Sequence, residues 1–428
     1  MPSRYPSFRC SVPCLILLLQ ALFLSRAFFA FPGAPVSYFP PNLYPAFQDV
    51  NHMVIFGFGF FLMVLRRYGF SSTGFNFLLV VLGVQCSFLV EDLLKLLRVQ
   101  HNEFGMQSLV RAVVSMTAVV ISTGAVLGKA NPVQLIVMTL VELIIFHVSR
   151  WINSTFLEVP ENLTFMHVHL FGAYFGLAVT SCFPEPPPGL DKNRSTPKSE
   201  LFSVLGTVFV WVFWPSFNSI LLESRWEAAL STCLALAVSA VAAFMLSALT
   251  SKDGKFRMAH IHSAVLAGGV TISYTAKIIQ YPWIAMILGL LGSVISILGS
   301  HCLQRCFNPP LKLQDTSGVH FTFGLPAVLG AVAAVPLRVV REINQWSDLS
   351  SLGYLTFFEI GAICQTISTA LITGLITGLI LNIKLLKAVH VSKYFDDQFY
   401  WEVSFQMISD SLGGSSFSTL MKNSMYLN

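Results

Sequence analysis

Charge is the scarcest property of this sequence. Only 11% of its 428 residues are charged, whereas 54% are hydrophobic. Soluble domains carry charge on about a quarter of their residues. A water-soluble domain would not need so much apolar surface, so the composition favours a protein that crosses a lipid bilayer several times.

Three other features are missing. Apolar and polar residues do not alternate with regular turns, which makes a transmembrane β-barrel an unfavourable interpretation. No nucleophile–base pair and no metal-ligand spacing stands out, so neither an enzyme nor a metal or cofactor site is predicted. The eight cysteines fall in apolar stretches or on the expected inner side, which gives no disulfide framework. The net charge of +5 follows from the loops and requires no nucleic acid.

Long apolar stretches are abundant, and twelve of them reach the length of about 20 residues that a spanning helix needs. They lie at 13–32, 47–65, 72–96, 107–127, 131–149, 163–183, 202–222, 227–249, 259–277, 281–302, 318–339 and 355–384. Helices satisfy their own backbone polar groups in lipid. The sequence therefore predicts an all-α polytopic membrane protein with twelve spans.

Lys and Arg set the expected orientation. With the N-terminus in the cytoplasm, most of them fall in inner segments, as Arg66, Arg67 and Lys252 do. Both termini are therefore expected to be cytoplasmic. A cleaved signal peptide is the alternative for the first stretch, because two arginines precede it. Its long apolar run, which Arg26 interrupts, and the lack of a small-residue cleavage site favour a retained span.

Two stretches, "ENLTFMHVHLFGAYFG" and "DTSGVHFTFGLPAVLG", share one layout. Glu161 stands eight residues before His169, and Asp315 stands eight residues before Phe323. Small residues that allow close helix packing follow in both. The stretches open the sixth and eleventh spans, which are five apart and therefore cross the membrane in opposite directions. This pattern predicts an inverted repeat with a pathway at the repeat interface.

Histidine inside a span is costly and either lines a cavity or bonds to a neighbouring helix. The repeated frame favours pore lining for His169, whereas a helix partner is the better interpretation for His52 and His147. Glu161 and Asp315 are expected to cap or hold helix ends, because anions are favoured at helix N-termini.

Several motifs resemble the Rh branch of the ammonium transporter/Rh family. They are "HLFGAYFGLAV", "GAVLGK", "WPSFNS", "HSAVLAGGV" and "DTSGVH", and "KYFDDQFYWE" looks most like the erythroid Rh blood-group polypeptides. The resemblance runs from the N-terminus to about Trp401. It implies an eleven-helix inverted-repeat core plus one extra N-terminal helix, a homo- or heterotrimer with one pore per protomer, and a multi-pass protein of the red-cell plasma membrane.

The predicted spans, the repeat and the Pro-rich loop "PEPPPGLDKNRSTPKSE" also predict a division of the chain. The expected parts are an N-terminal cytoplasmic segment with the extra helix (1–32), a first repeat (47–183), a cytoplasmic linker (184–201), a second repeat (202–339), a last membrane helix (355–384) and a cytoplasmic tail (385–428).

The family's substrate is ammonia/ammonium, and the resemblance makes His169 the first of two pore histidines. The second falls on Phe323. Of the two gate phenylalanines, Phe217 matches one, and the other falls on Val114. Glu161 stands where the family has Asp. These departures argue against an efficient ammonia pore, and His320, nearly a turn away from Phe323, is interpreted as a helix-start residue.

Two functions follow as hypotheses. The first is a non- or weakly conducting subunit that assembles with an Rh glycoprotein in the red-cell membrane, with attachment to the ankyrin–spectrin skeleton implied by the resemblance. The alternative is a channel that conducts ammonia/ammonium, or carbon dioxide, through a half-lost histidine pair.

Candidate modification sites complete the prediction. Asn153 and Asn162 are glycosylation sequons in one expected outer loop. Cys10, Cys14 and Cys306 are juxtamembrane cysteines, where palmitoylation is a candidate modification.

Overall fold

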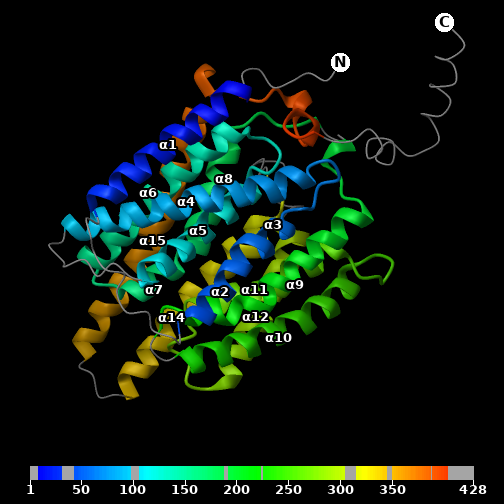
Figure 1. Ribbon diagram of the computed structural model, residues 1–428. Coiled ribbons are helices and arrows are strands. Elements are labelled where there is room, and N and C mark those ends of the chain that lie inside the picture. The colour runs from blue at the N-terminus through cyan, green and yellow to red at the C-terminus, as the bar shows by residue number, and fades with distance from the viewer. Residues whose placement is uncertain are drawn as a thin grey trace, which may run out of the picture.

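The computed structural model of the chain describes residues 8–30, 43–97, 106–187, 191–222, 225–303, 315–344, 349–386 and 388–402. Over these residues the chain forms helices and short turns, and the helices run side by side as a bundle (Figure 1). The long helices are α1 (Phe8–Ala30), α4 (Gly69–Leu97), α5 (Met106–Ala125), α6 (Pro132–Phe156), α8 (Val168–Ser181), α9 (Pro197–Ser219), α10 (Arg225–Thr250), α11 (Met258–Ser273), α12 (Pro282–Leu298), α14 (Leu325–Asn344) and α15 (Leu349–Leu381).

Ten helices of the described chain are long and apolar enough to cross a membrane, against twelve predicted spans. One difference is the stretch predicted at 47–65, which is broken into α2 (Tyr44–His52), a π-helical turn η1 (Met53–Gly57) and α3 (Phe58–Phe61). The other is α11, which has only 16 residues. Within the described residues, helix makes up most of each of the twelve predicted stretches, so the all-α membrane architecture is confirmed while the lengths of two helices differ.

The π-helical turn η1 explains the break in the second predicted span. Such a turn disturbs the regular helical hydrogen-bond ladder and is frequently found at functional sites. The Nδ2 atom of Asn76 on α4 donates to the carbonyl oxygens of Val54 and Ile55 at 3.3 Å each. A side chain from a neighbouring helix thus satisfies backbone groups that lipid could not.

The helices pack in two groups that meet across the middle of the molecule. In the first half, α5 packs on α4 and α8; in the second half, α10, α11 and α12 pack on one another. α15 lies against α8 and α6, and α9 lies against α3 and η1. α1 packs at the edge of the bundle, on α4 and α6 (Figure 1), and only 17% of the residues in its most apolar stretch are buried. Its outer face is therefore available to lipid.

Both stretches with the repeated layout open with an interrupted helix. In the first, α7 (Glu161–Met166) ends at His167 before α8 begins. In the second, a π-helical turn η4 (His320–Gly324) precedes α14. η4 packs on both α8 and α11, so the second interrupted opening lies at the junction of the two halves.

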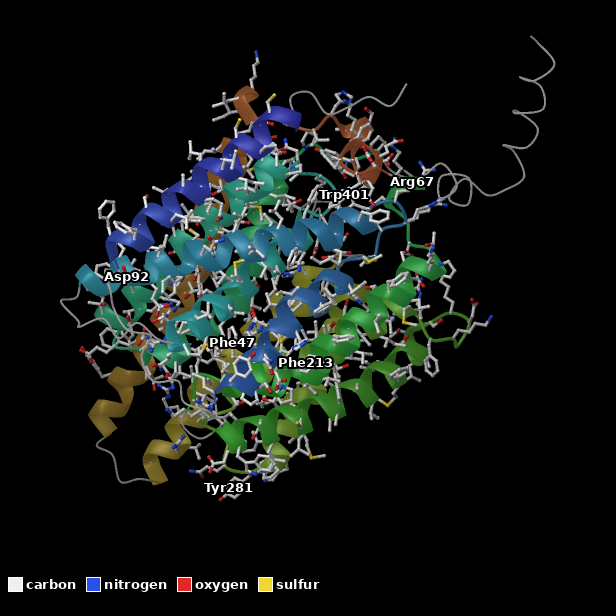
Figure 2. All side chains as sticks on the ribbon, in the orientation of Figure 1. Phe47, Arg67, Asp92, Phe213, Tyr281 and Trp401 are labelled. Atoms are coloured by element: carbon white, nitrogen blue, oxygen red, sulfur yellow. The ribbon has the colours of Figure 1, made fainter. Side chains whose placement is uncertain are left out.

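The C-terminal segment 391–401 folds back onto the bundle. Its short turns η6 (Val391–Lys393) and η7 (Asp397–Phe399) lie at the end of the bundle where α1 begins (Figure 1). The Asp397 carboxylate accepts the backbone N–H groups of Phe70 and Ser71, at the start of α4, at 2.8 Å each. Trp401 Nε1 donates to Ser71 Oγ at 3.0 Å, and Figure 2 shows Trp401 at this end of the molecule, near Arg67. Part of the predicted tail is therefore packed structure.

A glycine makes the second contact of the C-terminal segment possible. Gly128, in the loop between α5 and α6, has a φ of +77°, which side chains other than glycine rarely adopt. Its carbonyl oxygen accepts the N–H of Phe395 at 2.9 Å. The segment therefore ties the α5–α6 loop to the start of α4.

Candidate pore site

His169 lies near the start of α8 and is buried among aromatic rings. Its ring stacks on Trp214 with 5.5 Å between centroids and meets the Phe217 ring edge-on at 5.6 Å. Nδ1 lies 3.4 Å from the carbonyl oxygen of Met166. Because a carbonyl oxygen can only accept, Nδ1 carries the proton, and Nε2 of the neutral ring is an acceptor. That Nε2 atom has no hydrogen-bond partner among the described residues.

Phe323, in η4, enters the same cluster from the second half of the chain. Its ring stacks on Trp214 at 6.5 Å and packs against Phe58 at 5.8 Å and Phe61 at 5.9 Å. It is 1% exposed. The structure thus brings both His169 and Phe323 against one residue, Trp214, rather than leaving Phe323 at the lipid surface.

We call Phe58, Phe61, Trp214, Phe217 and Phe323 the aromatic cluster. Each of the five side chains is at most 1% exposed. The cluster is continuous, because Trp214 also meets Phe217 at 6.2 Å and Phe58 meets Phe61 at 5.9 Å. Rings fill the space next to His169.

The other predicted gate position is smaller. Val114 on α5 is fully buried and belongs to the same hydrophobic core as the aromatic cluster. Val114 is the position to which the resemblance assigns the second gate ring, and valine carries no ring.

Trp214, Phe58 and Phe61 were not among the residues predicted for the site. A signal was available for Trp214, which precedes Phe217 by three residues in "WPSFNS" and so shares its helix face. Phe58 and Phe61 have the same spacing. Nothing in the spacing shows that these two faces meet Phe323, because that contact joins separate parts of the chain.

Glu161 lies at the N-terminus of α7 in a network of charges. Its Oε1 atom is 3.6 Å from Arg111 and 3.5 Å from Arg150. Arg111 also pairs with the buried Glu91 at 3.1 Å. The Arg150 guanidinium lies 3.1 Å from the centroid of the Phe165 ring, a cation–π arrangement. These contacts hold the ends of α5, α6 and α7 together.

Asp315 caps the N-terminal end of η4 with its carboxylate. Its two carboxylate oxygens accept the N–H groups of Val319 at 2.9 Å and His320 at 2.8 Å. Burial raises the pKa of Asp315, although these two bonds oppose the change. His320 is the first residue of η4, and its ring packs edge-on against Tyr174 at 6.0 Å.

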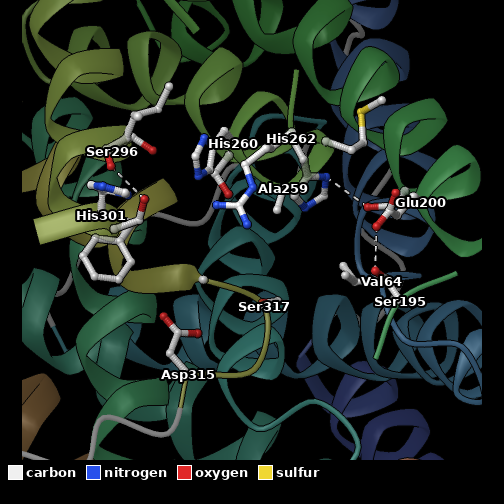
Figure 3. Close-up of a pocket in the computed structure, with 18 of the residues that line it drawn as sticks. Val64, Ser195, Glu200, Ala259, His260, His262, Ser296, His301, Asp315 and Ser317 are labelled. Atoms are coloured by element: carbon white, nitrogen blue, oxygen red, sulfur yellow. Dashed lines mark hydrogen bonds between the residues drawn. The ribbon is translucent and has the colours of Figure 1, made fainter. Parts of the chain in front are cut away.

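A cavity of about 770 Å³ opens where α9 and α11 begin and η4 starts. Hydroxyl, imidazole and carboxylate side chains line it (Figure 3), among them Ser195, Glu200, Ser203, His260, His262, Ser296, His301, Asp315 and Ser317. In the predicted orientation this is the cytoplasmic end of the molecule. The sequence prediction did not include a polar cavity here.

The predicted modification sites differ in accessibility. Asn153 is 1% exposed, and its Nδ2 donates to Thr366 Oγ1 at 3.1 Å, so a glycan on Asn153 does not fit the folded chain. Asn162 lies on α7 and accepts the N–H of Leu163 at 3.0 Å. Cys10 and Cys14 are exposed on α1, whereas Cys306 lies outside the described residues.

Comparison with known proteins identifies the family. Residues 40–397 match the model of the Ammonium Transporter Family. The chain is 41% identical over 420 residues to an RH-like protein of Macaca mulatta, which covers 94% of this chain and 98% of that protein. The chain belongs to the Rh branch of the ammonium transporter family.

Other members of the family agree with this assignment. The chain is 40% identical to the blood group Rh(D) polypeptide of Rattus norvegicus and 39% identical to the blood group Rh(CE) polypeptide of Homo sapiens, with 94% of this chain and 98% of each relative covered. Among solved structures, Nitrosomonas europaea Rh50 superposes with a TM-score of 0.72 at 25% identity, covering 90% of this chain and 97% of Rh50. Saccharomyces cerevisiae Mep2 superposes with a TM-score of 0.64 at 17% identity, covering 81% and 86%. The fold predicted from the motifs is confirmed.

Proposed function

We propose that this chain is a structural subunit of an Rh complex that conducts little or no ammonia itself. In this proposal it assembles with an Rh glycoprotein as a homo- or heterotrimer in the red-cell plasma membrane. The names of its relatives support the blood-group assignment. The start of α1 and the C-terminal segment lie at the same end of the bundle (Figure 1), which supports two cytoplasmic termini.

The aromatic cluster is the observation that carries this proposal. Phe323 packs on Trp214, whose ring also stacks on His169, so a benzene ring stands close to the imidazole that the resemblance assigns to the pore. A benzene ring neither donates nor accepts a conventional hydrogen bond. Moving an ammonium ion past it would remove water from the charge without replacing those bonds, and such desolvation costs many kcal/mol. The ring both occupies volume and offers no site for a proton.

Conduction of neutral ammonia is a second candidate, and one observation favours it. His169 keeps an Nε2 atom with no partner among the described side chains, although most buried polar groups in proteins are paired. An acceptor held in this way could bind an ammonia molecule. Nitrosomonas europaea Rh50, which shares the fold, is described as a member of the Rhesus protein family of channels.

Proteoliposomes distinguish the two candidates. We expect wild-type protein, with folding confirmed by gel filtration, to alkalinise no faster than empty liposomes when ammonia is added. Phe323→His restores an imidazole and should raise the rate by about 10²-fold or more, within the range for a positioned proton-transfer group. Phe323→Leu is the matched control, because it removes the ring without adding a proton acceptor.

The two variants separate two possible effects of Phe323, its bulk and the lack of a proton-accepting group. Equal acceleration by the Leu and His variants would show that Phe323 acts only by its bulk. Rapid alkalinisation by wild-type protein would reject the structural-subunit proposal in favour of the channel. Co-expression with an Rh glycoprotein and purification in mild detergent tests assembly, and failure of the two chains to co-purify would contradict it.

A further inference from the structure

Three segments that lie far apart in the sequence meet at the end of the bundle where α1 begins. They are the loop 62–68 between α3 and α4, the stretch 191–198 that leads into α9, and the C-terminal segment 391–401. The backbone N–H of Arg66 donates to the carbonyl oxygen of Arg194 at 3.0 Å. This bond joins the first segment to the second.

The C-terminal segment contacts both of the others. Its Asp397 donates a backbone N–H to the carbonyl oxygen of Arg67 at 2.8 Å. Its Asp396 forms an ion pair with Lys192, with 2.8 Å between Oδ2 and Nζ. Lys192 also lies 5.9 Å from the centroid of the Phe399 ring. The three segments therefore form one continuous surface, and each of them contributes basic residues to it.

We call these basic residues the basic patch. It consists of Arg66, Arg67, Lys192, Arg194, Lys198 and Lys393, each of which is exposed or half-buried. Figure 2 shows Arg67 at this end of the molecule, near Trp401. Within the part of the chain that the structure describes, no ion pair is formed by Arg67, Arg194, Lys198 or Lys393. The charges of these side chains are available to a ligand.

The acidic residues in and next to the same segments do not cancel this charge. Four of them, Asp191, Glu200, Asp396 and Asp397, stand against the six basic residues. Asp396 and Asp397 are only 5% and 7% exposed, because the first pairs with Lys192 and the second accepts the amides at the start of α4. Glu200 lines the neighbouring cavity. The outward surface is therefore mainly basic and favours an anionic ligand.

The basic patch lies at the level where the hydrocarbon of a bilayer ends. Arg67 is two residues before α4, and Lys198 is in the first turn of α9, four residues before the predicted span at 202–222. Four helical residues rise by about 6 Å. Phe70 is 45% exposed, and its ring lies 6.3 Å from that of Trp401. Aromatic rings are enriched at the membrane–water interface, so the ligand that fits this position is a lipid headgroup.

We propose that the basic patch binds an anionic lipid whose headgroup carries phosphomonoesters, of the phosphatidylinositol bisphosphate class. Guanidinium groups bind phosphate oxygens in pairs, and ammonium groups add point charges. A phosphomonoester carries about −1.5 to −2 charges, so a headgroup with two of them can engage cations of several segments at once. In the predicted orientation the patch faces the cytoplasmic leaflet, whose anionic lipids attract such clusters. Binding there does not depend on whether the chain conducts ammonia.

The arrangement couples lipid binding to docking of the C-terminal segment. Lys393 belongs to that segment, and Asp396 of the segment holds Lys192 in place. The complete patch therefore exists only while the segment is docked. Because such coupling is reciprocal, the bound lipid should hold the segment on the bundle.

The first test measures lipid binding to the wild-type full chain by native mass spectrometry in a neutral detergent, which has no charged bilayer surface. Phosphatidylinositol bisphosphate should bind about 25-fold more tightly than phosphatidylserine, for two more cation contacts at about fivefold each. Equal affinities would overturn the inference and leave the basic patch to a protein ligand. Inositol trisphosphate that binds as tightly as the lipid would also overturn it, because the ligand would then be a soluble phosphate.

Two variants with the same change of charge locate the binding. Lys393→Gln should weaken binding of the bisphosphate lipid by about fivefold, the factor for one cation at a lipid surface. Lys255→Gln is the control, because Lys255 is exposed in the loop between α10 and α11 at the same end of the molecule but outside the basic patch. It should leave the affinity unchanged. Equal losses in the two variants would show general attraction to positive charge and would refute a site.

Hydrogen exchange on the wild-type chain in the same detergent tests the coupling. With the bisphosphate lipid at about ten times its dissociation constant, exchange of the Phe70 and Ser71 amides, which Asp397 covers, should slow by about tenfold. Phosphatidylserine at the same concentration should slow it much less. A bound bisphosphate lipid that leaves these amides unprotected lies elsewhere on the protein, and that result would overturn the inference even if Lys393→Gln failed to fold.

Discussion

The contact between Asp397 and the first turn of α4 allows a quantitative test. Asp397→Ala removes a carboxylate that accepts two backbone N–H groups, those of Phe70 and Ser71, at 2.8 Å each. These N–H groups are at a helix N-terminus, where they have no partner within the helix. The negative charge is also favourably placed for the dipole of α4. The C-terminal segment should therefore detach more readily in the variant.

The expected size follows from measured helix caps. Replacing a capping Asp by Ala costs about 0.5–2 kcal/mol, which is a factor of about 2–30 in an equilibrium constant. Hydrogen exchange of the Phe70 and Ser71 amides at neutral pH should accelerate by that factor. Asp397→Asn is the matched variant, because it keeps one acceptor oxygen without the buried charge, so exchange should be slower than in Asp397→Ala.

The same contact should depend on pH. Burial raises the pKa of Asp397 from 3.8 to about 6, against the opposing effect of its bonds to Ser71 and Phe70. The docked segment therefore binds the proton more tightly than the detached one. Docking should be strongest below about pH 4, weaken as the pH rises to about 6, and stay constant above that. The pKa shift from 3.8 to about 6 corresponds to a loss of about 3 kcal/mol of docking free energy between low and neutral pH.

Hydrogen exchange followed by mass spectrometry, corrected for the intrinsic pH dependence of exchange, measures both effects. Peptides that cover Phe70 and Ser71 report the cap, and peptides within 388–402 report the segment. Asp397→Asn should abolish the pH dependence between pH 4 and pH 6. Unchanged protection of Phe70 and Ser71 in Asp397→Ala, or docking that strengthens as the pH rises, would refute the reasoning.

Two further predictions concern packing inside the bundle. Arg338→Ala should lower the free energy of unfolding by about 3–5 kcal/mol, because it leaves the buried Glu359 carboxylate without its ion-pair partner. In thermal melting, adding Glu359→Gln should recover most of this loss. No recovery would contradict the charge argument. Gly206→Ala should cost about 1–3 kcal/mol, because a Cβ there would overlap the backbone of Phe61 and push α9 from α3. Gly353→Ala, with open space around it, is its control, and equal melting temperatures of the two alanine variants would argue against close packing at Gly206.

Hydropathy and periodicity predicted the helical stretches well, because lipid leaves a spanning chain few alternatives to the helix. They could not predict where a helix is interrupted. The π-helical turn at Met53–Gly57 depends on Asn76, which lies on another helix and supplies the missing hydrogen bonds. Hydropathy, which averages over a window, does not register a single polar partner.

The site was predictable where the two halves repeat. The shared frame predicted a common location for His169 and Phe323, and both rings do contact Trp214. The partners of the charged residues could not be predicted in the same way. Arg111 lies inside a predicted span, but its pairing with Glu91 and Glu161 joins three separate helices, and no sequence spacing encodes that meeting.

His262 shows a further limit of motif reading. It stands in "HSAVLAGGV", which served only to indicate the family. Its tautomer depends on two hydroxyls of α9, Ser203 and Thr207, and on the carbonyl groups to which they donate. Such a chain of donors becomes visible only when the helices are assembled.

The cap on α4 has a consequence for biosynthesis. Phe70 and the carboxylate that it contacts are 327 positions apart, so the ribosome finishes nearly the whole chain before the two can meet. Until then the first turn of α4 has exposed amides at the membrane surface. A transcript that stops shortly before codon 397 would encode all the membrane helices that the structure describes and yield a product in which α4 lacks this cap.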